Sequence, residues 1–162
     1  MLMIKRLFFL MLLPAFLGGV ASAQTKAPAA PAPKATAAEA TALANRAIAH
    51  IKDVGPEKAF ADFSAQDGKW VDRELYVLVI GFDGIMKAHG TVKPLIGKPQ
   101  LEMRDVNGKF MSKEMLEVAQ TKGTGWVDYL WSNPVTKKID PKSTYVVRIP
   151  GYDGFVGVGI YK

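Results

Sequence analysis

Hydrophobic and polar residues follow two different periods along this chain. Between Ala40 and Ile51 the apolar residues recur every three or four positions, which is the spacing of an amphipathic helix. Thr36 and Glu39 precede this stretch in a capping-box arrangement, in which a hydroxyl and a carboxylate satisfy free amides at a helix start. We therefore predict a long helix that begins after Thr36 and ends near Gly55.

A shorter helix and a first pair of strands are predicted next. Pro56 suits the first turn of the shorter helix. From Trp70 onward the period changes, and residues 74–82 are apolar on both alternating faces, as expected for a central strand that is covered on both sides. Asp83-Gly84 is a tight hairpin signal, so residues 85–89 are predicted to form the returning strand.

The rest of the chain predicts one more helix and three more strands. A turn at Asn107-Gly108 precedes a predicted helix at 112–120, and the strands are predicted at 125–131, 144–149 and 155–161. Two helices followed by a meander of strands with one crossing helix predict an α+β domain on an antiparallel sheet.

The N-terminal 23 residues have the three-part composition of a secretory signal peptide. Two basic residues precede an apolar run that ends near Leu17, and small residues follow up to Ala23. The apolar run is shorter than the roughly 20 residues that a membrane span needs, so we expect cleavage after Ala23 and a periplasmic or secreted protein without a membrane span. Residues 24–35 are mostly Ala, Pro and Lys and predict an extended linker, and residues 36–162 predict a single domain.

The composition argues against several classes of function. The chain has no cysteine, and its net charge of +6 comes from scattered lysines rather than from a basic stripe interleaved with aromatic residues. His50 and His89 are the only histidines, and neither their spacing nor their context suits a metal site or a nucleophile with its base. We therefore expect no catalytic residues, no metal, no cofactor and no nucleic-acid partner.

The best candidates for binding are aromatic residues in the second half of the chain. In a strand, Tyr129 and Trp131 share one face and Trp126 lies on the other. Rings with polar tips suit a small pocket, although their spacing alone favours packing in the core. His89 is the better binding candidate of the two histidines, because imidazole can donate to a carboxylate, and His50 is expected to be structural.

Taken together, the motifs between about Trp70 and Tyr161 resemble those of single Cache domains of the second type, which are extracytoplasmic sensor modules of bacteria. In chain order these motifs are Leu75-Tyr76-Val77, Asp83-Gly84, Ala88-His89-Gly90, Pro94-Leu-Ile-Gly97-Lys98, Asp105-Val-Asn-Gly108-Lys109, Gly125-Trp126-Val-Asp-Tyr129-Leu-Trp131, Lys142-Ser-Thr-Tyr145-Val and Gly157-Val-Gly159-Ile-Tyr161. Each motif alone is weak, but their order and spacing are specific.

The resemblance implies a PAS-like fold, in which a long N-terminal helix packs across a five- or six-stranded antiparallel sheet. It also implies a cavity on the other face of that sheet, which binds small organic acids without catalysis. The positions that match the pocket pattern of the family are Tyr76, His89, Trp126, Tyr129, Trp131, Lys142 and Tyr145. Lysine, histidine and tyrosine tips on one sheet face suit a carboxylate, and the rings suit a short apolar tail.

Two hypotheses about function follow. The first is a periplasmic module that binds or senses a small organic acid. Because the sequence ends at Lys162, directly after the last predicted strand, we expect no output domain, and a membrane-bound signalling protein would have to read the bound state. The second is a non-enzymatic adaptor with a vestigial pocket, which docks on a membrane sensor kinase, transporter or redox protein through its first helix or its linker.

Overall fold

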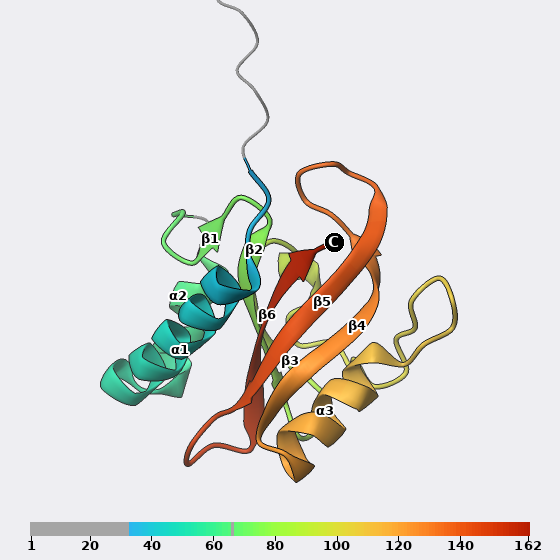
Figure 1. Cartoon of the computed structure of the whole chain (residues 1–162). Coiled ribbons are helices and arrows are strands. Elements are labelled where there is room, and N and C mark those ends of the chain that lie inside the picture. The colour runs from blue at the N-terminus through green and yellow to red at the C-terminus, as the bar shows by residue number, and fades with distance from the viewer. Residues whose placement is uncertain (1–32, 66) are drawn as a thin grey trace, which may run out of the picture. The chain divides into compact units, whose positions relative to one another are not determined.

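The computed structural model describes residues 33–65 and 67–162, which fold into three α-helices, a short 3-10 helix and six strands (Figure 1). The helices are α1 (Ala37–Val54), α2 (Pro56–Ser64), η1 (Lys93–Leu95) and α3 (Met111–Thr121). The strands are β1 (Val71–Asp72), β2 (Leu75–Gly81), β3 (Met86–His89), β4 (Thr124–Ser132), β5 (Ile139–Arg148) and β6 (Gly154–Tyr161). The predicted signal peptide and residues 24–32 of the predicted linker lie outside the described residues.

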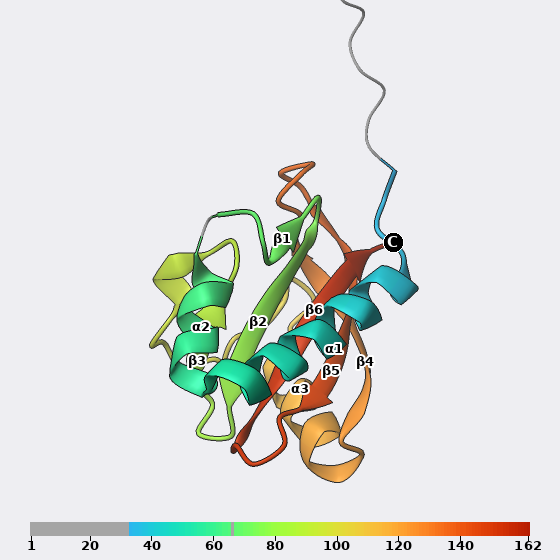
Figure 2. The same cartoon turned by 90° about the vertical axis from the view of Figure 1, so that its left-hand side faces the viewer.

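The strands form one antiparallel sheet in the order β1-β2-β6-β5-β4, and β3 pairs with β2 beside this path. Helices α1 and α2 cover one face of the sheet, and α3 with the connection before it covers the other (Figures 1 and 2). The predicted fold class, a long N-terminal helix on a five- to six-stranded antiparallel sheet, is therefore confirmed. Within the described part of the chain, no helix combines the length and the hydropathy needed to cross a bilayer.

Strand β2 has a hydrophobic core on each side, as its unbroken apolar pattern predicts. All seven of its residues are buried. Val77 and Val79 pack into the core beneath α1, whereas Leu78 and Ile80 pack into a second core that includes Met115 of α3. The second core is the one that contains the candidate site.

Strand β5 is the element that the sequence pattern describes least well. The prediction began it at residue 144, but the strand begins at Ile139 and includes Pro141. Proline has no N–H for the ladder and weakens the sequence signal for a strand. Here the carbonyl of Pro141 still accepts a hydrogen bond from the Lys162 N–H, at 2.9 Å. The two-residue strand β1 and the helix η1 were not predicted.

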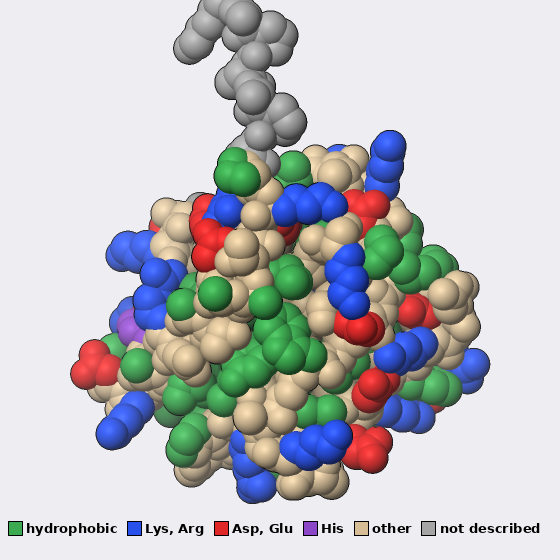
Figure 3. All heavy atoms as spheres, viewed as in Figure 1, with side chains coloured by type: hydrophobic (Ala, Val, Ile, Leu, Met, Phe, Trp, Pro, Cys, Tyr) green, Lys and Arg blue, Asp and Glu red, His purple; other side chains and the backbone are tan. Residues whose placement is uncertain are grey.

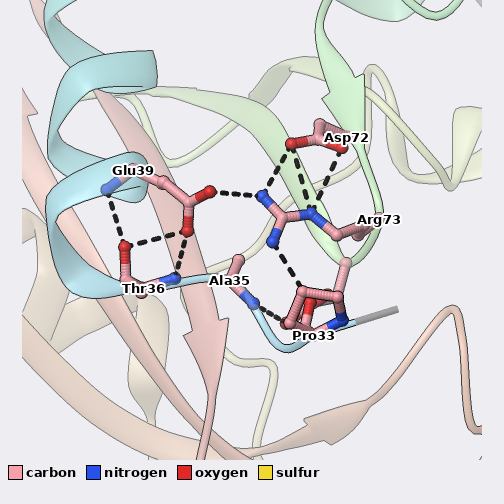
Figure 4. Close-up of polar contacts among 7 residues, drawn as sticks. Pro33, Ala35, Thr36, Glu39, Asp72 and Arg73 are labelled. Atoms are coloured by element: carbon pink, nitrogen blue, oxygen red, sulfur yellow. Dashed lines mark hydrogen bonds and ion pairs between the residues drawn. The ribbon is translucent and has the colours of Figure 1, made fainter. Parts of the chain in front are cut away.

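The start of α1 is tied to the turn between β1 and β2 by an ion-pair cluster (Figure 4). The Arg73 guanidinium donates to Glu39 Oε1 at 2.6 Å, to Asp72 Oδ2 at 2.8 Å and to the Pro33 carbonyl at 3.1 Å. Hydrogen bonds to the Glu39 carboxylate lower its pKa to about 2. The bond from the Thr36 backbone N–H has the largest effect, and the bond from Arg73 has the next largest. The cluster holds the start of α1 and the residues before it against the turn between β1 and β2.

The last residues of the predicted linker pack against the domain rather than extending away from it. Ala35 is buried, and its N–H donates to Glu74 Oε1 at 2.6 Å. Lys34 Nζ donates to the carbonyl of Lys162 at 2.8 Å, so the two ends of the described chain lie side by side (Figures 1 and 2).

The capping box at the start of α1 makes a testable contribution to stability. Thr36→Ala removes the hydroxyl that accepts from the Glu39 N–H, and we expect it to lower the free energy of unfolding by about 1 kcal/mol in urea denaturation followed by circular dichroism. The control is Thr41→Ala, because Thr41 lies inside the helix and alanine is the better helix former there. Equal losses in the two variants would contradict the capping role.

Candidate functional site

A small cavity lies between the sheet and α3. Its wall includes Tyr76 of β2, His89 of β3, Tyr129 and Trp131 of β4, and Met111 of α3. The remaining wall residues, taken from the same elements and from the connection before α3, are Leu78, Ile80, Met86, Leu95, Gln100, Met103, Ser112 and Met115. The cavity volume is about 30 Å³, which is more than the roughly 10–15 Å³ that one water molecule needs. The wall residues, all within the described part of the chain, include no Asp, Glu, Lys or Arg.

Five of the seven predicted site residues lie together on this side of the sheet. Tyr76, His89, Tyr129 and Trp131 line the cavity. Lys142 of β5 lies directly behind Tyr76, with its Nζ 2.6 Å from the phenol oxygen. The structure thus brings a cation, an imidazole and three rings into one cluster.

Trp126 and Tyr145 lie on the opposite face of the sheet, away from the cavity, which corrects the expectation from the family resemblance that both line the pocket. They are cross-strand partners in the β4–β5 ladder, with ring centroids 5.2 Å apart. Because side chains alternate along a strand, Trp126 and Tyr129 must point to opposite faces. Tyr145 packs against the core beneath α1, and Trp126 is 39% exposed. Figure 3, which has the orientation of Figure 1, shows hydrophobic side chains gathered at the centre of that view.

Lys142 is a buried cation surrounded by aromatic rings. Its side chain is only 1% exposed, and Nζ lies 3.9 Å from the ring centroid of Tyr76 and 4.9 Å from that of Tyr161. Tyr129 faces it across the β4–β5 ladder. Among the described residues, no carboxylate forms an ion pair with this ammonium. Burial lowers the pKa of Lys142 to about 7.

Gly159 of β6 makes room for the lysine. A Cβ at this position would overlap Cε of Lys142 and Oγ1 of Thr144. Any residue larger than glycine would therefore push the lysine stem away from the sheet.

His89 is held as a neutral hydrogen-bond donor. Its Nδ1 accepts from the backbone N–H groups of Val92 at 3.0 Å and Thr91 at 3.3 Å. Burial, and then the charge of Lys142, lower the pKa of His89 to about 3, so the ring is uncharged near neutral pH. Because Nδ1 is an acceptor, the proton lies on Nε2, which makes no hydrogen bond with the described residues.

The three tyrosines around Lys142 also remain neutral. Burial raises the pKa of Tyr76, Tyr129 and Tyr161 above the ordinary value. Tyr129 already has a partner, because its hydroxyl lies 2.9 Å from Thr144 Oγ1. Tyr161 donates to the carbonyl of Ser132 at 2.7 Å. Tyr76 differs, because its oxygen accepts from the Lys142 ammonium at 2.6 Å, and Tyr161, Thr91 and Trp131 are its other polar neighbours. The cluster therefore presents donors and one positive charge, which is an environment for an anion.

The sequence pattern did not identify the wall residues Gln100 and Ser112 or the methionines. Residues 90–110 contain little regular structure, so no helical or strand period indicates which of their side chains point inward. The start of α3 was predicted, but not the face of α3 that closes the cavity. The sequence therefore carries no signal that assigns these residues to the cavity wall.

Comparisons with known proteins agree with this geometry. A sequence model of a family described as Single Cache domain 2 matches residues 26–162. The crystal structure of a methyl-accepting chemotaxis protein from Vibrio parahaemolyticus RIMD 2210633 is similar, with a TM-score of 0.65 and 21% identity over 76% of this chain and 86% of that one.

Two further solved structures are similar to the same extent. The periplasmic sensor domain of a chemotaxis protein has a TM-score of 0.61 and 28% identity, over 76% of this chain and 88% of that chain. A Cache chemosensory domain solved to explain carboxylic acid recognition has a TM-score of 0.61 and 20% identity, over 76% of this chain and 86% of that chain. These similarities establish the Cache fold.

Lys142 predicts an unusual dependence of stability on pH. The folded protein releases the lysine proton near pH 7, whereas the unfolded chain holds it up to about 10.5, so the free energy of unfolding should rise as pH increases from 7 toward 9. We expect Lys142→Met to abolish this rise and to stabilise the protein at pH 6 to 7, because an apolar side chain replaces a buried charge without a carboxylate partner. Urea denaturation at pH 6, 7, 8 and 9 measures both effects.

The control for this measurement is Lys138→Met, which changes an exposed lysine and should leave the pH dependence unchanged. A Lys142→Met protein whose stability keeps the wild-type dependence on pH would show that the buried ammonium is not its source.

Gly159→Ala tests the packing of the lysine stem. We expect this change to lower the free energy of unfolding by about 1–3 kcal/mol, because the added methyl overlaps Lys142 and Thr144. In a Lys142→Ala background the same change should cost much less, which a double-mutant cycle measures. The same cost in both backgrounds would mean that the lysine stem is not what Gly159 accommodates.

Proposed function

The chain belongs to the Single Cache domain 2 family, and from this premise we propose that it is a non-enzymatic module that binds and senses a small organic acid. The observation that carries the proposal is the buried ammonium of Lys142. It has no ion-pair partner among the described carboxylates, and it lies behind a cavity whose wall supplies further donors. Burying an unpaired charge is costly, and the carboxylate of a ligand would offset that cost.

Recognition would use two donors of this cluster. A carboxylate in the cavity accepts from the Tyr76 hydroxyl and from the His89 Nε2–H. Lys142 donates to the Tyr76 oxygen at 2.6 Å, which makes the phenol a stronger donor and places a positive charge behind it. The rings and methionines exclude water around an apolar tail.

The size of the cavity favours small acids. A volume of about 30 Å³ is too small for any organic acid without movement of the wall. Much of that wall is Leu95 and the methionines Met86, Met103, Met111 and Met115. Methionine is unbranched and adapts its shape readily, so these side chains can move to admit an acid of two to five carbons.

We further propose that binding takes place outside the cytoplasm. The support is the signal peptide predicted over residues 1–23, together with the periplasmic location of the similar chemotaxis sensor domain. A membrane-bound signalling protein is the partner that we propose to read the bound state.

A panel of two- to five-carbon carboxylic acids tests the proposal by thermal denaturation. An acid at a hundredfold excess over its dissociation constant adds about 2.7 kcal/mol to the free energy of unfolding and raises Tm. Lys142→Met should remove this response. The affinity of the wild-type protein should fall as pH rises above about 7, because the lysine then loses the charge that pairs with the carboxylate.

A matched pair of variants tests which face of the sheet binds the acid. Tyr76→Phe should weaken the response to the acid, because it deletes a hydroxyl beside the cavity. Tyr145→Phe should keep the full response, because Tyr145 lies on the face beneath α1. The proposal is wrong if no acid raises Tm, or if Lys142→Met responds as the wild type does.

A further inference from the structure

The wall of the cavity carries a second polar region, which the proposed carboxylate site does not use. Gln100 is only 1% exposed, and its backbone N–H donates to the Gly84 carbonyl at 2.8 Å. Its side-chain Nε2 donates to the carbonyl of Lys98 at 3.0 Å, which fixes the orientation of the amide. Oε1 of Gln100 accepts no hydrogen bond from the described residues, although the side chain lines the cavity.

Ser112 is a second buried polar side chain in the same wall. It is 4% exposed and is the second residue of α3. Its hydroxyl makes no hydrogen bond with the described residues. Since no fully enclosed side-chain oxygen or nitrogen in the described chain lacks a partner, the Ser112 hydroxyl and Gln100 Oε1 both border open space. Both side chains line the cavity.

The Gln100 end of the cavity lies away from the Tyr76–His89 end. The Lys98 carbonyl that holds Gln100 also accepts from the N–H of Met86, at the start of β3. His89 ends the same strand, three residues further on, which corresponds to about 10 Å. Apolar side chains, including Leu78 and Ile80, line the stretch between the two ends. The cavity is therefore polar at both ends and apolar between them.

The chemistry of this end selects a neutral hydrogen-bond donor. Gln100 Oε1 is an acceptor, so a second carboxylate would meet a lone pair there rather than a donor. An ammonium group would be buried without a counter-charge, because no wall residue in the described chain is acidic. A hydroxyl can donate to Gln100 Oε1 without a counter-charge.

We propose that the cavity prefers short acids that carry a hydroxyl remote from the carboxylate, with Gln100 Oε1 as the acceptor for that hydroxyl. This inference rests on the proposed function, because it assigns the far end of the same ligand. It predicts a ligand class that is narrower than carboxylic acids in general.

The test compares ligands that differ only in the hydroxyl. Calorimetric titration of the wild-type protein uses 3-hydroxypropanoate, 4-hydroxybutanoate and 5-hydroxypentanoate, each paired with the unsubstituted acid of the same chain length. At least one hydroxy acid should bind roughly three- to tenfold more tightly than its partner, which is the gain expected from one additional neutral hydrogen bond.

Gln100→Leu tests the residue assignment. This variant should lose the preference for the hydroxy acid and keep the affinity for the unsubstituted acid. The control, Gln120→Leu, changes an exposed glutamine near the end of α3 and should keep the wild-type preference. The wild-type comparison does not depend on the variant, so the inference stays testable if Gln100→Leu does not fold.

The outcomes distinguish this inference from the proposed function. If neither series binds, the proposed function fails. If each unsubstituted acid binds as tightly as its hydroxy partner, the inference is overturned and the proposed function stands. Tighter binding of 4-aminobutanoate than of 4-hydroxybutanoate would also overturn the inference, because it would require an acidic counter-charge.

Discussion

The arrangement of this domain depends on one constraint, which is that strand β2 is buried on both faces. Each of its residues must enter one of two cores, so the alternation of side chains assigns Val77 and Val79 to the helix α1 side and Tyr76 and Leu78 to the cavity side. A shift of one residue in register would exchange these sets. The position of Tyr76 in the cavity wall follows directly from this constraint.

The buried ammonium of Lys142 suits the binding of an anion, but its burial lowers the stability of the fold. Rings and a phenol oxygen compensate a buried ammonium only in part, and the lowered pKa of the lysine expresses the remaining cost. A side chain chosen for stability alone would be apolar at this position. The fold tolerates the cation because Gly159 leaves space for the stem and because well-packed cores on both sides of the sheet hold the strands in place.

The periodic parts of the chain could be predicted from sequence, and the parts that depend on tertiary contacts could not. The helix from Ala37 and strand β2 follow from the spacing of their apolar residues. The alternation rule also placed Trp126 opposite Tyr129, whereas the family pattern grouped the two together. That Tyr145 faces away from the cavity with Trp126 follows from the β4–β5 register, which no local pattern encodes. Gln100 belongs to a connection without a period, so only the structure brings it to the cavity.

The neighbouring ends of the described domain have a practical consequence. Lys34 Nζ is 2.8 Å from the carbonyl of Lys162, and the fold begins and finishes within the same corner of the sheet. A short glycine-rich connector can therefore join the two ends, and new ends can be opened at the Asn107-Gly108 turn close to α3. A fluorescent protein fused across such an opening would be attached beside an element that forms part of the cavity wall, which makes the domain a natural starting scaffold for a genetically encoded metabolite reporter.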